Sequence, residues 1–410
     1  MSDQNQTPDL AASAHGYRWA VLAGVWLVYF SFGLTIVTLA PLVSVVGQDL
    51  GLSHSRMGTV MGAWQLVFIA SAIPCGVLLD RIGPRRALLL AVLVIAASGA
   101  LRAAAGGHLS LFLAVALFGL GGPLVSVGAP KLIGLWFEGQ ERRFAMGLYM
   151  TGPAVGSVAS LALTNSLMMP LLGGNWRAVM LAYAAVVLAV GLVWLAVTAH
   201  PASRAIEQRL AAEPREPQFA AFAELLGIPA VRIVLAMAIG IFFVNHGLNN
   251  WLPEILRSHG MAAAEAGFWA AIPTAVGIIA APTIPRLATP ARRMGILAAL
   301  FLLAAGATLL LLSADGALLA AALVMQGMAR GGMMTLAILI LLDVPEVGSR
   351  RTGLAGGLFF SAAEVGGSLG PMSIGVLAQL SDGFAASLGM LTGITVALLA
   401  LLLVLRRKTA

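Results

Sequence analysis

Charged side chains are scarce in this 410-residue chain: they make up 10% of the sequence, whereas 60% of its residues are hydrophobic. Soluble domains carry roughly 25% charged residues. The shortage therefore excludes an ordinary water-soluble protein and indicates a chain that crosses a lipid bilayer many times. The net charge of +7 does not indicate a nucleic-acid partner, because the basic residues stand in loops between apolar runs, where membrane topology accounts for them.

Cysteine is almost absent, and so are the motifs of cofactor chemistry. The single cysteine, Cys75, excludes an internal disulfide and offers no cluster for a metal ion. The sequence contains no Walker-type phosphate loop and no visible catalytic triad. We therefore expect no enzyme activity, no cofactor and no metal. Residues 1–16 are polar and lack the apolar core of a signal peptide.

Apolar runs of about 20 residues, the length that crosses a bilayer, recur along the whole chain. The twelve predicted spans are 18–41, 56–79, 87–105, 111–135, 144–168, 178–199, 229–253, 265–285, 294–312, 317–342, 352–380 and 384–405. The charged, proline-rich stretch 200–228 interrupts them and is predicted as a linker, with a short surface helix within 205–212. The expected organisation is a tail (1–17), a six-helix bundle (18–199), the linker, a second bundle (229–405) and a tail (406–410).

Lysine and arginine fall unevenly on the two sides of these spans. With the N-terminus inside, 18 of the 24 basic residues lie on the inner side and only four on the outer side. Positively charged short loops stay in the cytoplasm. We therefore expect a multi-pass protein of a bacterial-type inner (plasma) membrane, with both termini cytoplasmic.

A charged turn stands between the second and third spans. Residues 76–86 carry an acid and three arginines around a glycine–proline bend, and its key positions are Gly76, Asp80, Arg81, Gly83, Arg85 and Arg86. This pattern resembles the signature loop between helices 2 and 3 of the major facilitator superfamily. The resemblance implies an all-α membrane protein with twelve helices in two pseudo-symmetric six-helix bundles. It also implies that the loop controls conformational gating, and that helices 1, 4, 7 and 10 line a central cavity.

The two halves repeat each other weakly, as the resemblance implies. At an offset near 208, Arg142-Arg143 matches Arg350-Arg351, and at a slightly larger offset Val155-Gly156 matches Val365-Gly366. Each match alone is weak, but their order along the chain agrees. The Gly-Pro segment around Gly156 also predicts a kinked, closely packed helix.

Two ionisable residues, Arg330 and Glu364, lie near the middle of predicted spans, where charge is costly and usually functional. In one interpretation Arg330 binds an anionic group and Glu364 takes a proton. In the other, the two side chains form a structural ion pair between neighbouring helices. The two roles are compatible, because a pair that breaks during transport would serve both.

Neutral polar residues gather in the seventh span. Asn245, His246, Asn249 and Asn250 are predicted to line the cavity, and the nearby Pro253 would allow the outer part of this helix to unwind. Helix–helix hydrogen bonding is the alternative. The other candidate substrate contacts are Gln326, one turn before Arg330, and Tyr29 and Gln65 in the first half.

These observations favour a secondary active transporter that moves a small, anionic solute by alternating access with proton coupling. The alternative is efflux of lipophilic or amphipathic compounds by proton antiport. The stretches 249–254, 260–261 and 131–137 are similar to the cyanate-permease-like branch of the superfamily, which is associated with small anions and small organic solutes. The expected partners are the solute, protons and the lipid bilayer, and a monomer is expected.

Overall fold

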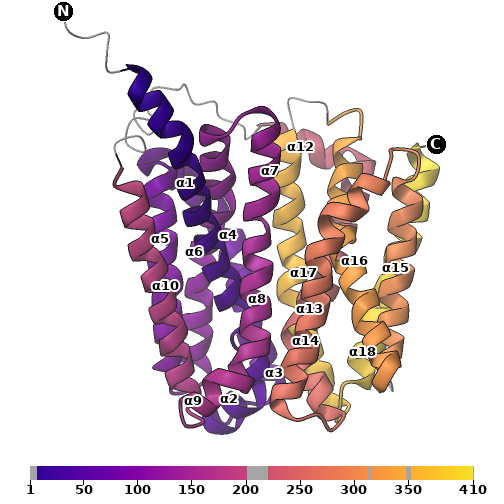
Figure 1. Ribbon diagram of the computed structural model, residues 1–410. Coiled ribbons are helices and arrows are strands. Elements are labelled where there is room, and N and C mark those ends of the chain that lie inside the picture. The colour runs from indigo at the N-terminus through magenta and orange to yellow at the C-terminus, as the bar shows by residue number, and fades with distance from the viewer. Residues whose placement is uncertain (1–6, 201–219, 313–314, 348–351, 410) are drawn as a thin grey trace, which may run out of the picture.

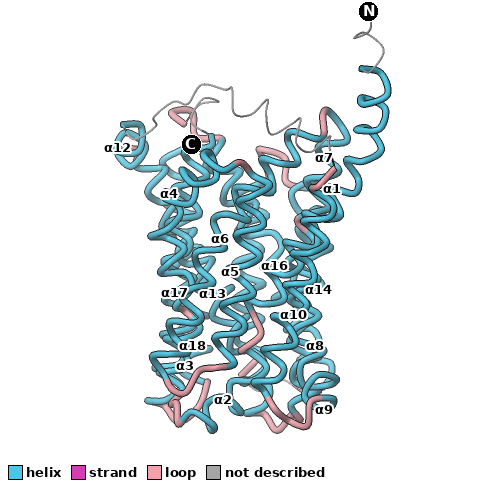
Figure 2. Tube along the Cα trace, turned by 90° about the vertical axis from the view of Figure 1, so that its left-hand side faces the viewer, coloured by secondary structure: helices cyan, strands magenta, loops and turns pink. Residues whose placement is uncertain are grey.

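The computed structural model describes residues 7–200, 220–312, 315–347 and 352–409, and the secondary structure of this part of the chain is helical, without strands. The helices stand side by side in two groups, coloured indigo to magenta and orange to yellow in Figure 1. Both chain ends lie at one end of the bundle, here called the termini side, together with α12 (Figure 2). The opposite end, with α2, α3 and α9, is the far side.

Six transmembrane segments make up the first half, and several are built from more than one helix. Their elements are α1 (Thr7–Ile36), η1 (Ala40–Leu42), α2 (Val43–Leu50), α3 (His54–Met61), α4 (Ala63–Ile82), α5 (Pro84–Ala103), α6 (His108–Trp136), α7 (Gly139–Tyr149), α8 (Thr151–Leu163), η2 (Thr164–Met168), α9 (Met169–Leu171) and α10 (Trp176–Thr198). The first segment is longer than predicted, because its helix begins at Thr7 and its last part ends at Leu50.

The second half has one continuous helix per segment. These are α13 (Pro229–Ser258), α14 (Ala263–Leu287), α15 (Arg293–Leu310), α16 (Gly316–Leu342), α17 (Thr352–Leu380) and α18 (Ala385–Thr409), preceded by the short α12 (Ala220–Gly227). Eleven of the twelve segments are long and apolar enough to cross a membrane by length and composition. The twelfth, α17, has 29 residues, and its glycines, serines and Glu364 make it less apolar.

Three details differ from the sequence-based expectations or lie beyond them. The predicted unwinding of the seventh span is wrong, because α13 stays helical through Pro253 to Ser258. The end of the predicted linker forms α12. The helix predicted within 205–212 lies outside the described residues. The domain boundaries given above stay a prediction.

Glycines let helices of the same half touch backbone to backbone. A Cβ atom added at Gly156 of α8 would lie 2.1 Å from the carbonyl oxygen of Phe30 in α1. In the second half, a Cβ atom added at Gly366 of α17 would lie 1.8 Å from the carbonyl oxygen of Ile239 in α13. The sequence match between these glycines is thus also a match of packing, and the predicted close contact at Gly156 is confirmed.

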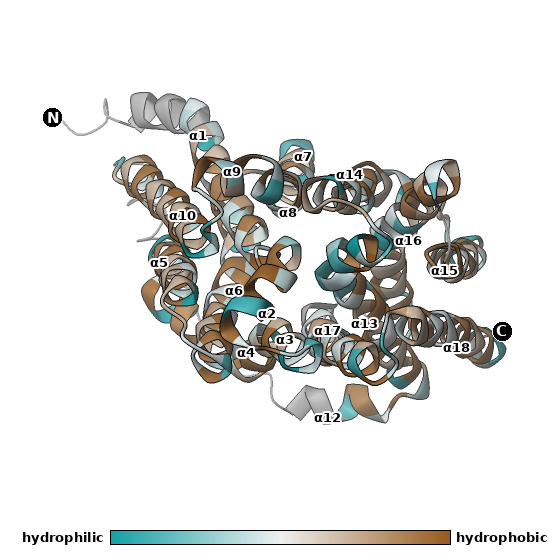
Figure 3. Ribbon diagram, turned by 90° about the horizontal axis from the view of Figure 1, so that it is seen from below, coloured by the Kyte–Doolittle hydropathy of each residue, from teal (hydrophilic) through white to brown (hydrophobic). Residues whose placement is uncertain are grey.

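Four helices lie at the two edges of the molecule. Figure 3 places α5 and α10 at one edge of the molecule and α15 and α18 at the other. Large apolar side chains are exposed on them: Leu192 of α10 is 69% exposed and Leu302 of α15 is 58% exposed. Surfaces of this kind are suited to hydrocarbon, because they offer it no unsatisfied polar group.

Contacts between the halves gather on the far side. A Cβ atom added at Gly58 of α3 would lie 2.6 Å from the carbonyl oxygen of Pro371 in α17. Ser44 of α2 donates a hydrogen bond of 2.6 Å to Glu254 of α13. On the termini side, by contrast, Cβ atoms added at Gly76 of α4 and Gly357 of α17 would meet no heavy atom within 4 Å. The halves are therefore closely joined at these far-side contacts, whereas the Cβ positions of the two termini-side glycines face open space.

Candidate substrate and coupling site

Arg330 of α16 is held by neutral groups from two other helices. Its Nη1 atom donates hydrogen bonds to Oδ1 of Asn249 in α13, at 2.7 Å, and to Oγ1 of Thr274 in α14, at 3.1 Å. Within the described residues Arg330 forms no ion pair, and neither Nε nor Nη2 donates to a protein group. The alternative of an Arg330–Glu364 ion pair is therefore wrong for this conformation. The Nε–Nη2 edge stays available for a bidentate acceptor.

The polar residues of α13 divide between two directions. Asn249 contacts Arg330, whereas His246 lies against α4, where its Nδ1 is 3.4 Å from Nε2 of Gln65. Asn250 donates to the backbone oxygen of His246, one turn earlier in its own helix, at 2.9 Å. Asn245 is half-buried, and its Oδ1 atom is buried without a hydrogen-bond partner. The predicted polar face thus serves two separate neighbourhoods.

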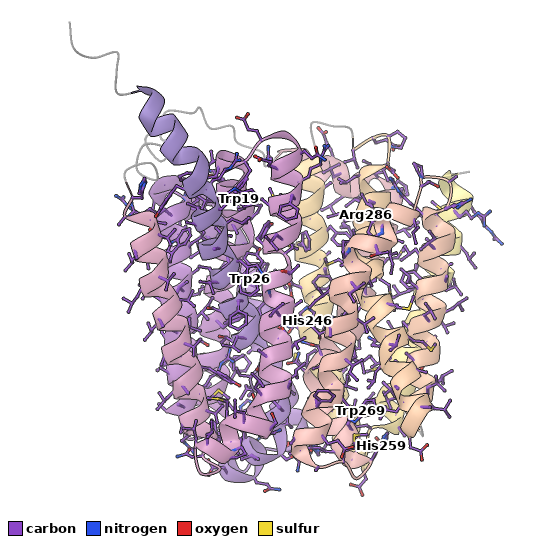
Figure 4. The ribbon with its side chains drawn as sticks, viewed as in Figure 1. Trp19, Trp26, His246, His259, Trp269 and Arg286 are labelled. Atoms are coloured by element: carbon purple, nitrogen blue, oxygen red, sulfur yellow. The ribbon has the colours of Figure 1, made fainter. Side chains whose placement is uncertain are left out.

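The second neighbourhood joins the two halves at mid-height. Nε2 of Gln65 in α4 donates to the backbone oxygen of Gly367 in α17 at 3.1 Å. Glu364 is buried one turn earlier in α17, and its Oε2 atom has no hydrogen-bond partner. Figure 4 places His246 at the boundary between the halves, about midway between the two ends of the bundle. The indole of Trp64 in α4 also lies beside His246, with ring centroids 5.8 Å apart.

The remaining candidate substrate contacts are not all drawn together. Tyr29 of α1 is buried and packs edge-on against Tyr149, with ring centroids 5.1 Å apart, so its contacts are with the first half. Gln326 of α16 is buried, and its Oε1 atom has no hydrogen-bond partner. Of these first-half and α16 candidates, the structure brings only Gln65 to His246.

The signature loop forms a tight turn at the termini side. Gly83 has φ +80°, a backbone conformation that favours glycine, and it ends α4 and precedes α5. The carbonyl oxygen of Arg85 accepts a hydrogen bond from Nε1 of Trp194 at 3.0 Å. Asp80 forms an ion pair with Lys131 of α6 at 2.6 Å. Gly76 and the exposed Arg81 and Arg86 complete the loop.

The sequence alone did not show the contacts of three side chains, Thr274, Lys131 and Arg102. Thr274 is one of two threonines in α14, and only its packing shows its contact with Arg330. Lys131 of α6 pairs with the loop residue Asp80, a contact between two segments that no local pattern indicates. Arg102 of α5 is 2% exposed and donates to the backbone oxygen of Thr35 and to Oγ1 of Thr38, both at 2.9 Å. A lone arginine among alanines was the available signal for that buried site.

Comparisons with known proteins agree with this architecture. A putative tartrate transporter of Agrobacterium vitis is 23% identical over 94% of this chain and 89% of its own length. A quinolone resistance transporter of Acinetobacter baumannii is 26% identical over 85% of this chain and 84% of its own length. The crystal structure of the nucleoside transporter NupG superposes with a TM-score of 0.77 at 14% identity, covering 94% of this chain and 99% of that one.

The family is shown by a match along most of the sequence. The profile of the Major Facilitator Superfamily matches residues 25–371 and, in a second overlapping match, residues 248–410. The similarity to the branch named above stays a prediction. Two six-helix halves, the signature loop and the profile match agree, and the chain belongs to the Major Facilitator Superfamily of membrane transporters and is not an enzyme.

Proposed function

We propose that this transporter moves a small organic anion by proton-coupled alternating access, with Arg330 as the anion anchor. The observation that carries the proposal is the environment of Arg330, whose hydrogen-bond partners in the described structure are the neutral side chains of Asn249 and Thr274. A cation among helices of a membrane protein is costly without a counter-charge. A bound carboxylate would supply that charge.

The anchored geometry of Arg330 supports a carboxylate over a diffuse anion. Because Asn249 and Thr274 both engage Nη1, they orient the guanidinium plane and leave the Nε–Nη2 edge free. Two parallel N–H donors match the two oxygens of a carboxylate. The relative described as a putative tartrate transporter supports the same class of substrate. Asn245, His246, Gln326, Gln65 and Tyr29 are proposed as further contacts, and Glu364 as the proton carrier.

The orientation in the membrane is part of the proposal. The excess of arginine and lysine on the termini side supports a cytoplasmic location for both ends. A cysteine introduced at the exposed Glu138 should then react with an impermeant maleimide only from the cytoplasm. A cysteine at the exposed Ser53 should react only from outside. Reversed labelling would overturn the orientation. A monomer in an inner membrane is proposed with it.

Ligand binding and uptake by Arg330 variants test the anchor. We expect tartrate and other small carboxylates to raise the unfolding temperature of the purified protein, since a ligand of the native state stabilises it. Arg330→Ala should abolish this shift and uptake into proteoliposomes. Arg330→Lys should also fail, because an ammonium does not reproduce the bidentate fork. Arg286→Ala, at the termini side (Figure 4), is the control and should keep both properties.

The double variant Arg330→Ala with Glu364→Ala separates the anchor from a structural role. If the two charges served only each other in some other conformation, removing both would restore folding and uptake. If Arg330 holds the anion, the double variant folds but does not bind or transport it. Normal uptake by the double variant would end the anchor hypothesis.

Efflux of amphipathic compounds is the second candidate, and the relative described as a quinolone resistance transporter supports it. The two candidates differ in their ligands. Thermal stabilisation by hydrophobic amines or quinolones, together with none by carboxylates, would favour efflux. Such binding should also survive Arg330→Ala, because the anchor would have no anion to hold.

A further inference from the structure

We propose that Gln65, His246 and Glu364 form a single proton-binding junction between the two halves, and that a proton bound there holds the far side closed. The inference rests on the proposed proton coupling and deepens it. It adds Gln65 as a positioning residue from the first half, and it assigns to the coupled proton an effect on conformation.

One glycine brings the three side chains together. A Cβ atom added at Gly367 would lie 2.8 Å from Oε2 of Glu364, 3.3 Å from Cγ of Gln65 and 3.4 Å from Cδ2 of His246. Groups from α17, α4 and α13 therefore surround one point that any larger residue at this position would fill. Gly367 also accepts the hydrogen bond from Nε2 of Gln65 at 3.1 Å. The glycine thus provides both the space for the cluster and its link across the halves.

Two buried oxygen atoms of this cluster have no hydrogen-bond donor, and one added proton would supply it. Gln65 uses its amide nitrogen toward Gly367 and His246, while its Oε1 atom is buried without a partner. Oε2 of Glu364 is also buried without a partner. Both oxygens are acceptors when the carboxyl is ionised. A proton bound to Glu364 turns Oε2 into a donor that Oε1 of Gln65 can accept, so a single proton satisfies two buried oxygens.

The helices around the junction offer a proton two titratable groups, Glu364 and His246. α3 also packs against α17, but its His54 lies at Gly375, near the far end of that helix. On α13 the titratable neighbour is His246, and on α16 the charged neighbour is Arg330, whose charge acts on His246. On α4 the facing side chains are Gln65 and Trp64, neither of which titrates. On α18 the sequence from Ala385 to Leu405 contains no ionisable residue. A proton entering from water therefore meets Glu364 and His246.

A proton at the junction can affect conformation because the junction contains residues from both halves. Gln65 belongs to the first half, whereas His246, Glu364 and Gly367 belong to the second. Gly62 and Ser368, about one turn further toward the far side, continue the same contact, since Ser368 donates to the carbonyl oxygen of Gly62 at 3.0 Å. Separating the halves on the far side pulls Gln65 from its partners. A proton that completes the junction must then favour the far-side-closed state, and closure must raise proton affinity by the same factor.

This direction suits uptake. A proton that binds from the far side together with the solute promotes closure behind both, so the loaded carrier opens toward the termini side. Release of the proton on that side removes the bond between Glu364 and Gln65, and the far side can open again. The chemistry is the binding of one proton to the Glu364 carboxylate and its later release to water on the termini side.

Distance measurements across the far side test the proposal directly. Spin labels are placed at two exposed far-side positions, Leu171→Cys and Leu380→Cys, which are 70% and 77% exposed, in a background with Cys75→Ser. Lowering the pH from about 8 to about 5.5 should raise the far-side-closed fraction of the otherwise unchanged protein several-fold. Glu364→Gln, whose amide can donate to Oε1 of Gln65 without a proton, should be closed at both pH values. Gln65→Met should lose the pH response.

A matched control separates the proton junction from contact between the halves in general. Ser368→Ala removes a hydrogen bond between the same two segments that has no titratable partner, so it should keep the pH response. An undiminished response in both Glu364→Gln and Gln65→Met would overturn the proposal. So would equal closure by added sodium at constant pH, because the site would then bind a metal cation. If Gln65→Met fails to fold, the pH-independent closure of Glu364→Gln still decides.

The same protein distinguishes this junction from the proposed anion site. Carboxylate binding is measured by thermal shift on Arg330→Ala and Glu364→Gln in parallel. If the otherwise unchanged protein shows no pH-dependent closure but binds carboxylates, the junction alone is overturned. Intact pH-dependent closure in a protein that binds no carboxylate overturns the proposed substrate class and leaves the junction standing.

Discussion

The two halves of this transporter share their helix packing but not their chemistry. Gly119 of α6 packs against the carbonyl oxygen of Trp64, and Gly327 of α16 packs against that of Pro273. Gly327 follows Gly119 by 208 positions. By the same offset, Gly122 of the first half is the equivalent position of Arg330 in the second half. A position that holds a guanidinium in one half therefore holds only a glycine in the other.

Two of the other polar positions follow the same asymmetry, and a third is polar in both halves. Using the glycine contacts of each helix pair as the guide, Ala154 of α8 corresponds to Glu364 of α17, and Val37 corresponds to His246. Gln65 and Thr274 correspond to each other, and each touches the polar site from its own half. The comparison suggests that the fold tolerates substitution at these positions. At the two unlike positions the polar side chain belongs to the second half, whereas the first half places packed aromatic rings such as Trp64 and Phe68 near the junction.

The largest effect is expected where the halves are alike. Gly156→Ala and Gly366→Ala would each place a methyl group about where a carbonyl oxygen of the neighbouring helix already lies. Overpacking of this kind costs about 3 kcal/mol of unfolding free energy, so both variants should give little folded protein in detergent. Gly76→Ala is the control, because its methyl group would meet open space in this conformation. If only one of the two variants lost folded protein, the similar packing of the two halves would not contribute equally to their stability.

A middle-sized effect should separate the buried Arg102 of the first half from the half-buried Arg330 of the second half. Arg102→Met removes the donor to the backbone oxygen of Thr35, where the helix of α1 ends. An unsatisfied buried carbonyl costs about 1–3 kcal/mol, so thermal stability should fall. Carboxylate affinity of the folded fraction should change by less than about twofold, a difference worth under about 0.5 kcal/mol.

Arg330→Met should do the opposite, with a small change in stability and a loss of carboxylate binding. Calorimetric unfolding and ligand titration on the two variants check the contrast. If Arg102→Met also abolished binding, the division between a structural and a ligand-binding arginine would be wrong.

The smallest effect on stability is expected from the termini-side ion pairs. The positions of the acid and the base are exchanged between the two halves. In the first half the acid Asp80 is near the loop and the base Lys131 is on α6. In the second half the base Arg293 begins α15 and pairs with the acid Asp343 at the end of α16. Both acids are about half exposed, so each pair contributes only about 0–1 kcal/mol.

Asp80→Asn should slow uptake several-fold while changing substrate affinity little, because the resembled loop acts in gating rather than binding. Uptake rates and ligand titrations on Asp80→Asn and Asp343→Asn compare the halves. A large loss of affinity with normal turnover would show that Asp80 has been given the wrong role.

Local properties of the sequence predicted the fold well. Apolar length and loop charge are written into each segment separately, so the twelve spans could be found without knowledge of their neighbours. The exception is α13, where Pro253 predicted unwinding but the helix continues. The proline lacks one N–H donor, and burial among the neighbouring helices keeps the remaining backbone helical.

Pairing within the site could be predicted only in part. Arg330 and Glu364 stood out because ionisable residues are rare at that depth. Their partners depend on the rotation of α16 and α17 about their axes, which no local pattern states. Arg330 turns toward Asn249 and Thr274, and Glu364 turns toward the junction with the first half. Gln65 was a candidate without a partner until the halves were placed together.

The backbone contacts at Gly156 and Gly366 have a mechanical consequence. At these two points no side chain lies between the helices to compress or change rotamer, so each helix pair is stiff there. A displacement at the far end of such a helix pair reaches the other end almost undiminished. A small rotation of the halves about the junction at Gln65 would therefore displace Gly76 and Gly357, on the termini side, by a larger distance.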